Sequence, residues 1–147
     1  MRARREKRER GREGPGCAAQ REPTLRFLHA RGWLHADVKP ANIFLDSGGG
    51  AWLGDFGSSV PLAAAAAGAP LRGTPAFQSE DVAPAAAPLR FDLTGLAVSV
   101  LVLVGLLDVA AAPWDGWPRA AVEAAAARVG CDALRAKVQA LLRGEAA

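Results

Sequence analysis

The chain has 147 residues, half of them apolar, and a formal net charge of +3. That length allows one ordinary domain with a buried core, and the apolar content excludes a chain that is disordered throughout. The positive charge is uneven, because residues 1–14 hold seven of the 18 basic side chains and three of the 15 acidic ones. The basic character therefore belongs to the N-terminal tail and not to the remainder of the chain.

Residues 1–22 form a charged leader that contains Gly and Pro, and we predict that it is disordered. No aromatic residue lies among the charges of residues 1–14, so a nucleic-acid-binding arm is the weaker interpretation. Three glutamates argue against a mitochondrial leader, and no secretory apolar segment is present. Cys17 and Cys131 lack the spacing of zinc or redox motifs, so we expect an intracellular protein, cytoplasmic or nuclear.

The first predicted elements are a short helix and a hairpin. Thr24 can cap a helix that runs to about Ala30, before Gly32. The apolar runs 42–45 and 51–53 are separated by a Gly-rich turn, which predicts two paired strands. Residues 58–90 show no clear periodicity, and their Ala-rich stretches fit either a loop or a marginal helix.

Three helices are expected in the rest of the chain, at about 92–107, 118–129 and 132–143. Residues 93–107 are all uncharged, but a membrane span needs about 20 residues, so this run predicts a helix buried inside a domain. Gly130 can end one helix before Asp132 caps the next. The predicted fold class is mainly α with a small β-hairpin (α+β), in a domain over 23–147.

The most informative motif is the run His35-Ala36-Asp37-Val38-Lys39-Pro40-Ala41-Asn42, followed by Asp55-Phe56-Gly57. Each polar residue alone is more often a turn former or a solvated charge. In this order the run resembles the protein-kinase signature H-R-D-L-x-x-x-N and D-F-G, with Ala36 in place of Arg. A Lys two residues after the catalytic Asp is typical of the serine/threonine type.

The resemblance implies a role for each matching residue. Asp37 would orient the substrate hydroxyl and accept its proton, and Lys39 would place a positive charge near the transferring phosphate. Asn42 and Asp55 would supply oxygen ligands to the Mg²⁺ that accompanies ATP. His35 would be structural.

The triplet that begins with Asp55 has two further members with implied roles in the activation segment. Gly57 would leave the backbone free to reposition the Asp55 carboxylate. Phe56 would pack into the core and so set that position.

Residues 73–80 look like the end of a kinase activation segment. By resemblance, Thr74 would touch the catalytic Asp and Lys, and Glu80 would form a buried ion pair with an Arg near the C-terminus. Arg135 and Arg143 are the candidate partners. Asp92 would open the central apolar helix and hold the backbone of the catalytic loop.

The sequence contains neither a G-x-G-x-x-G loop nor a V-A-I-K-type Lys, the parts that clamp the nucleotide in this family. We therefore expect a truncated kinase domain, a C-terminal lobe that lacks the N-lobe and is inactive when isolated. Its partners would be a protein substrate and an N-lobe or full-length kinase. A pseudokinase-like binding or regulatory module is the alternative, which Ala36, Ser79 and the alanine tracts favour.

Ala36 also bears on regulation. In many kinases the Arg at this place binds a phosphate on the activation loop. Residues 60–72 contain no Ser, Thr or Tyr, so the expected receptor and its phosphate are missing together. We expect any activity to be independent of phosphorylation there, and a phosphate on Ser58 or Ser59 that raised activity would contradict this.

Overall fold

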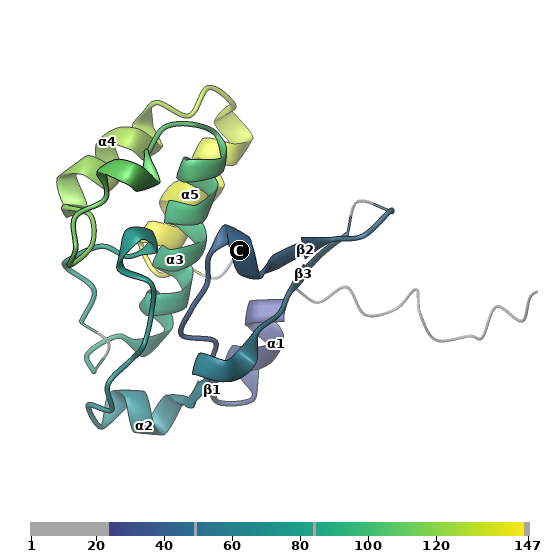
Figure 1. Cartoon of the computed structure of the whole chain (residues 1–147), viewed down its shortest axis with the longest axis vertical. Coiled ribbons are helices and arrows are strands. Elements are labelled where there is room, and N and C mark those ends of the chain that lie inside the picture. Colours follow the sequence, from purple (N-terminus) through teal and green to yellow (C-terminus); the bar gives the residue numbers. More distant parts are fainter. Residues whose placement is uncertain (1–23, 49, 84, 146–147) are drawn as a thin grey trace, which may run out of the picture.

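The computed structural model describes residues 24–48, 50–83 and 85–145. These residues are mainly helical and include two small antiparallel sheets (Figure 1). The predicted fold class is therefore confirmed at the level of a helical chain with a little β-structure. The predicted leader, residues 1–22, lies outside the described residues.

The N-terminal half holds a short helix and both sheets. Helix α1 (Thr24–Ala30) ends as predicted, although Thr24 is its first residue and not its cap. The predicted hairpin is formed by β2 (Ile43–Leu45) and β3 (Ala51–Leu53). It projects away from the helices in Figure 1. The second sheet was not predicted, and it pairs β1 (Trp33–Leu34) with β4 (Val60–Pro61). Two-residue strands this far apart in sequence leave no local pattern.

The predicted helices are present with shifted ends. The central helix, α3 (Pro88–Leu103), starts four residues before 92 and is followed by Gly105 at a φ of 73°, a left-handed residue that suits a helix end. Helices α4 (Arg119–Ala127) and α5 (Asp132–Leu142) lie within their predicted ranges, and α2 (Leu62–Ala66) adds one short helix. Asp132 is the first residue of α5 and does not cap it, since Cys131 occupies the cap position.

The main hydrophobic core surrounds α3, as predicted from its apolar sequence. Buried side chains of α3 pack against α4 and α5, and the core includes Leu101, Val122 and Val138. Figure 1 shows α3 and α5 side by side, and α5 is the helix that α3 contacts most. Gly95 permits a close approach, because a Cβ there would lie 3.0 Å from the carbonyl oxygen of Val38. The core therefore supports the loop that carries Asp37.

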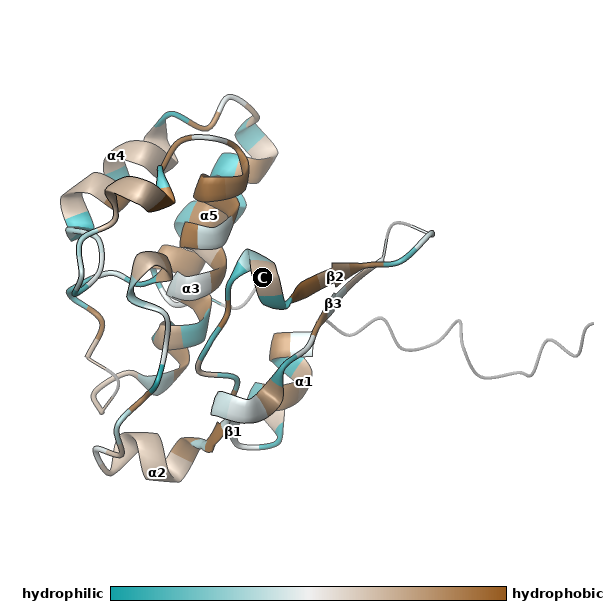
Figure 2. Cartoon of the chain, viewed as in Figure 1, coloured by the Kyte–Doolittle hydropathy of each residue, from teal (hydrophilic) through white to brown (hydrophobic). Residues whose placement is uncertain are grey.

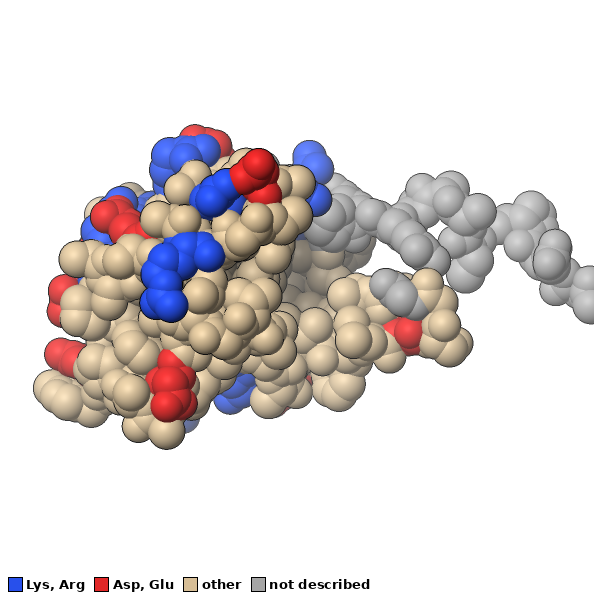
Figure 3. Space-filling view, turned by 90° about the horizontal axis from the view of Figure 1, so that it is seen from above, with Lys and Arg blue, Asp and Glu red and all other residues tan. Residues whose placement is uncertain are grey.

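The described surface is mixed in charge and partly apolar. On the face in Figure 3, basic and acidic side chains are interspersed over the helical body. Figure 2 shows a hydrophobic stretch along the projecting hairpin, where Phe44 and Trp52 are exposed. Within residues 24–48, 50–83 and 85–145, no helix has the length and hydropathy needed to cross a bilayer.

Candidate active site

The backbone of the loop between β1 and β2 is held by one buried carboxylate, that of Asp92. The backbone N–H groups of His35 and Ala36 donate to the two oxygens of Asp92, each at 2.8 Å. The imidazole of His29 donates to the same carboxylate at 2.9 Å. Asp92 thus holds the loop backbone, as the resemblance implied, but it lies one turn inside α3 and does not open that helix.

Two residues, one in this loop and one near it, adopt backbone conformations that glycine usually takes. Ala36 has a φ of 64° and Asp55 a φ of 58°, and among the described residues they are the only non-glycine residues with positive φ. Such conformations cost about 1–3 kcal/mol each and persist only where surrounding contacts impose them. At Ala36 the contact is its bond to Asp92, so this loop is held in a specific shape next to Asp37.

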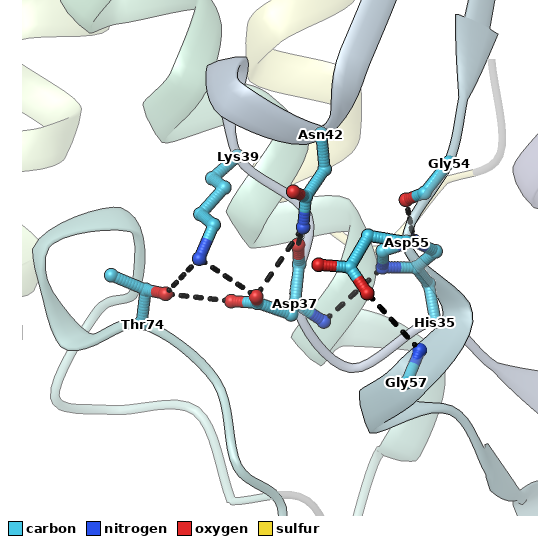
Figure 4. A network of polar contacts seen from close by, with 8 residues as sticks. All are labelled: His35, Asp37, Lys39, Asn42, Gly54, Asp55, Gly57 and Thr74. Atoms are coloured by element: carbon cyan, nitrogen blue, oxygen red, sulfur yellow. Dashed lines mark hydrogen bonds and ion pairs between the residues drawn. The ribbon is translucent and has the colours of Figure 1, made fainter.

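Asp37, Lys39 and Thr74 form a closed triangle of polar contacts (Figure 4). The Thr74 hydroxyl donates to Asp37 Oδ1 at 2.7 Å, and Lys39 Nζ lies 2.8 Å from Asp37 Oδ2. Lys39 Nζ also donates to Thr74 Oγ1 at 2.9 Å. The structure therefore brings together two loops that are 35 residues apart in sequence.

These contacts fix the charge on Asp37. Burial alone would raise its pKa, but hydrogen bonds from Lys39 and Thr74, the charge of Lys39 and a bond from Asn42 outweigh burial and lower the pKa. Asp37 is therefore ionised at neutral pH. The Asn42 amide nitrogen donates to the backbone oxygen of Asp37 at 2.9 Å and to Oδ2 at 3.3 Å. The amide oxygen of Asn42 is thus directed away from Asp37.

Hydrogen bonds connect the loop that carries Asp55 to both ends of the loop that carries Asp37. His35 Nε2 donates to the Gly54 carbonyl at 2.8 Å, and the Gly54 N–H donates to the Asn42 carbonyl at 2.9 Å. One oxygen of the Asp55 carboxylate accepts from the Gly57 N–H at 3.3 Å. Figure 4 shows the Asp55 carboxylate on the same side of the loop as Asp37 and Asn42.

The expected roles of the next two residues change. Phe56 is about half exposed and meets the His35 ring edge-on at a centroid distance of 5.2 Å, so it does not pack into the core. The left-handed backbone lies at Asp55 itself, whereas Gly57 is not among the glycines with positive φ.

The chemistry of the site suits a hard cation that is only partly held by protein. No group of three His, Cys, Asp or Glu residues in the part of the chain that the structure describes could hold a metal by itself. Asn42 and Asp55 offer two oxygen ligands, and Mg²⁺ commonly takes one or two protein ligands together with phosphate and water. The two residues therefore fit that ion when phosphates complete its shell.

The predicted ion pair of Glu80 is wrong, and its neighbour makes the contacts. Glu80 is exposed, while Asp81 Oδ2 lies 2.6 Å from Arg119 and 3.5 Å from Arg90. The Ser79 hydroxyl donates to Asp81 at 2.6 Å. The two proposed partners are engaged elsewhere, Arg135 with Asp132 and Arg143 with Glu145.

Asp81 gives a pH prediction. Burial raises its pKa, but the bonds from Ser79 and Arg119 and the charges of Arg119 and Arg90 lower it overall. A carboxyl with a lowered pKa stabilises the fold above its unfolded value, about 3.9, and loses this as the pH falls through the folded value. We expect Asp81→Asn to lower the free energy of unfolding at pH 7 by about 1–2 kcal/mol.

Urea unfolding at pH 7 and at pH 3 measures this effect. The difference between wild type and Asp81→Asn should shrink at pH 3, because acid removes the same charge from the wild type. Glu80→Gln is the matched control, and it should leave the midpoint unchanged. Equal losses for both variants at pH 7 would contradict the assignment of the ion pairs to Asp81.

Sequence reasoning missed three residues that make long-range polar contacts. His29, Asp81 and Arg119 each make a contact that spans at least 38 residues of sequence. For Asp81 the only signal was its position beside Glu80, and for the other two the sequence offered none.

Comparison with known proteins agrees with these motifs. A family model described as "Protein kinase domain" matches residues 15–92, which is 78 of the 147 residues. The serine/threonine-protein kinase mos of Gymnogyps californianus is 53% identical over 38 residues, 26% of this chain and 19% of that protein. Human serine/threonine-protein kinase STK11 is 39% identical over 62 residues, 40% of this chain and 14% of that protein.

A third relative, the mitosis inhibitor protein kinase SWE1 of Candida albicans, is 47% identical over 38 residues, 26% of this chain and 3% of that protein. In all three comparisons the match covers less than a fifth of the relative. The similarity to these relatives is therefore local, and the family-model match over residues 15–92 contains the motif.

Proposed function

The chain belongs to the protein kinase domain family, and from this we propose that it carries the phosphate-transfer half of a serine/threonine kinase site. The reaction would move the γ-phosphoryl group of ATP to a Ser or Thr hydroxyl of a protein substrate. The observation that supports this most directly is the triangle of Asp37, Lys39 and Thr74. The fold we propose for the described residues is correspondingly that of a kinase C-terminal lobe.

Asp37 is suited to receive the substrate hydroxyl. A carboxylate has about four lone-pair sites, and Thr74, Lys39 and Asn42 take three of them. The remaining site can accept a hydrogen bond from a substrate hydroxyl and point its oxygen at the phosphorus. Because the pKa of Asp37 is lowered, the group is ionised at neutral pH and can both orient the hydroxyl and accept its proton.

In the proposed step, one bond to the γ-phosphorus forms and one breaks. The hydroxyl oxygen forms a bond to the γ-phosphorus while the bond from that phosphorus to the β,γ-bridging oxygen breaks. ADP leaves, and the hydroxyl proton passes to Asp37. An ammonium has three N–H donors, and Lys39 uses two of them, so one remains for a phosphate oxygen.

Asn42 and Asp55 are the residues we propose as ligands of Mg²⁺. When bound, the ion would neutralise charge on the phosphates of ATP and help to align them. Asn42 contributes its amide oxygen, since the amide nitrogen is already committed to Asp37. The bonds through Gly54 hold Asp55 beside Asn42, which keeps the two oxygen donors on adjacent loops.

Transfer would require a second, nucleotide-clamping part. The 147 residues contain no G-x-G-x-x-G sequence, and positioning accounts for nearly all of the catalysis in phosphoryl transfer. We therefore propose that the chain alone is inactive and that an N-lobe or a full-length kinase completes the site. Use of ATP and a protein substrate would place the protein inside the cell, in the cytoplasm or the nucleus.

Labelled ATP tests this proposal. The chain is assayed alone and joined behind the nucleotide-binding half of an active serine/threonine kinase, called the fused protein below. We expect Mg²⁺-dependent labelling of casein on Ser or Thr by the fused protein and none by the chain alone. A fused protein that binds ATP without transferring phosphate would overturn the proposal.

A pseudokinase-like binding or regulatory module is the second candidate. It is favoured by the apolar surface of the hairpin beside the site, where Phe44, Leu45 and Trp52 are 57%, 77% and 59% exposed. Exposed apolar patches of this kind often mark interaction sites. Binding to a separate kinase without any phosphate transfer by the fused protein would support this second candidate.

A further inference from the structure

A second, smaller apolar cluster lies between the proposed active-site loop and the segment that follows it. Its four buried members are Leu34, Ala36, Ala65 and Phe91. Four partly buried side chains pack against them: Val60, Leu62, Leu71 and Val82. Ala65 and all four of these belong to residues 60–82, which we call the segment. The segment is thus attached to the body by five apolar side chains.

The start of the segment is also fixed by backbone contacts. Leu34 of β1 pairs with Val60 of β4, and the Leu62 N–H donates to the Gly32 carbonyl at 2.7 Å. Helix α2 follows directly and buries Ala65 completely, while its neighbour Ala66 is exposed. The helix therefore presents Leu62 and the methyl group of Ala65 to the cluster.

The apolar cluster adjoins both residues of the hydrogen bond between Thr74 and Asp37. Ala36 is fully buried and immediately precedes Asp37. Phe91 lies against Gly73, since a Cβ on Gly73 would be 2.6 Å from the end of the Phe91 ring. Gly73 immediately precedes Thr74, whose hydroxyl donates to Asp37. Movement of the cluster would therefore displace both ends of that hydrogen bond.

This chain cannot hold the segment by an ion pair between an Arg at position 36 and a phosphate in residues 60–72. An Arg at position 36 and a phosphate in the segment would form a strong charged pair. Position 36 is instead a buried Ala, and residues 60–72 contain no hydroxyl side chain. Nearby, the Ser59 hydroxyl faces the His35 carbonyl at 3.4 Å, and Thr74 is bound to Asp37 and Lys39.

We propose that the apolar cluster holds the segment in its substrate-facing position without phosphorylation, and that Ala65 and Phe91 are positioning residues for the proposed reaction. The part about catalysis rests on the proposed function, whereas the part about the segment does not. Ala65 acts through the packing of its methyl group, and Phe91 acts through its contact with Gly73.

Hydrogen exchange on the whole chain tests the packing directly. Ala65→Gly removes one buried methyl, and Ala66→Gly is the matched control with the same cost in helix propensity. Loss of one methyl is worth about 0.8 kcal/mol, so amides of 60–74 should exchange roughly fourfold faster in Ala65→Gly than in Ala66→Gly. The exchange rates of the α5 amides should be the same in both variants. Equal exchange of 60–74 in the two variants would overturn the proposal.

A charge at the same position gives a larger effect. Ala65→Glu would place a carboxylate in an apolar site, so hydrogen exchange of the amides of 60–74 should become at least about tenfold faster, whereas Ala66→Glu should change it little.

Phosphatase treatment of the wild type tests whether a phosphate helps to hold the segment. We expect unchanged exchange after treatment, and faster exchange of 60–74 after phosphate removal would overturn the proposal.

The positioning role needs a kinetic readout in the fused protein. We expect Ala65→Gly to raise the Michaelis constant for the protein substrate and to leave that for ATP unchanged. A mere loss of folded protein would lower kcat and change neither constant, and that result would contradict the role. Because exchange needs no nucleotide, a fused protein that transfers no phosphate would remove the proposed function and leave the exchange result intact.

Discussion

Asp37→Asn in the fused protein should lower the rate of phosphate transfer by about 10²–10⁴, the usual contribution of a positioned acid–base group. The amide keeps the size of the side chain but cannot accept the proton of the substrate hydroxyl. It also removes the negative charge that faces Lys39 at 2.8 Å. Initial rates with labelled ATP and casein at saturating Mg²⁺ measure the change.

The control for this prediction is a carboxylate far from the site. Asp132 lies at the start of α5 and pairs with Arg135, so Asp132→Asn should leave the rate within twofold of the unsubstituted fused protein. The Michaelis constant for ATP should change little in Asp37→Asn, because Asn42 and Asp55 are the proposed metal ligands. A rate for Asp37→Asn within tenfold of the unsubstituted protein would remove Asp37 from the proposed mechanism.

The parts of the site that were predictable are local in sequence. Asp37 and Asn42 were singled out by a short motif through its resemblance to the kinase signature, and the structure adds that the loop brings the Asn42 amide nitrogen to the Asp37 backbone oxygen. The hairpin was also predictable, since a Gly-rich turn between two apolar runs is a local signal. The contact of Thr74 with Asp37 came from resemblance and not from any pattern in the residues.

The parts that were missed depend on long-range geometry. Glu80 and Asp81 are adjacent acids, and only the path of the chain decides that Asp81 faces Arg119, which is 38 residues further on. Helix α2 is similar, because a run of alanines has helix propensity but no polar face to indicate which methyl is buried. The packing of Ala65 into the cluster that contains Ala36 selects that face.

The backbone of the loop that carries Asp37 shows the same dependence on distant residues. Ala36 has little intrinsic preference for a positive φ, and its conformation is imposed by a carboxylate 56 residues away. The resemblance implied that Asp92 holds the loop backbone, and the structure adds that its carboxylate accepts from two N–H groups and an imidazole. The burial of Asp92 is therefore a consequence of the loop that it holds.

Asp92→Ala should accordingly lower the free energy of unfolding by about 3–5 kcal/mol, because several buried donors lose their acceptor at once. The substitution leaves the N–H groups of His35 and Ala36 without an acceptor in a buried site, and each such group costs about 1–3 kcal/mol. It also removes the hydrogen bond that holds Ala36 in its left-handed conformation. Urea unfolding followed by circular dichroism measures the loss.

Two further variants separate this effect from a general sensitivity to substitution. Asp92→Asn keeps one acceptor oxygen, so its loss should fall between those of the wild type and Asp92→Ala. Asp108→Ala removes an exposed carboxylate that accepts from the Ala110 N–H, and it should cost only about 1 kcal/mol. If Asp92→Ala cost no more than Asp108→Ala, the loop would be held by other contacts, and the left-handed backbone at Ala36 would need a different cause.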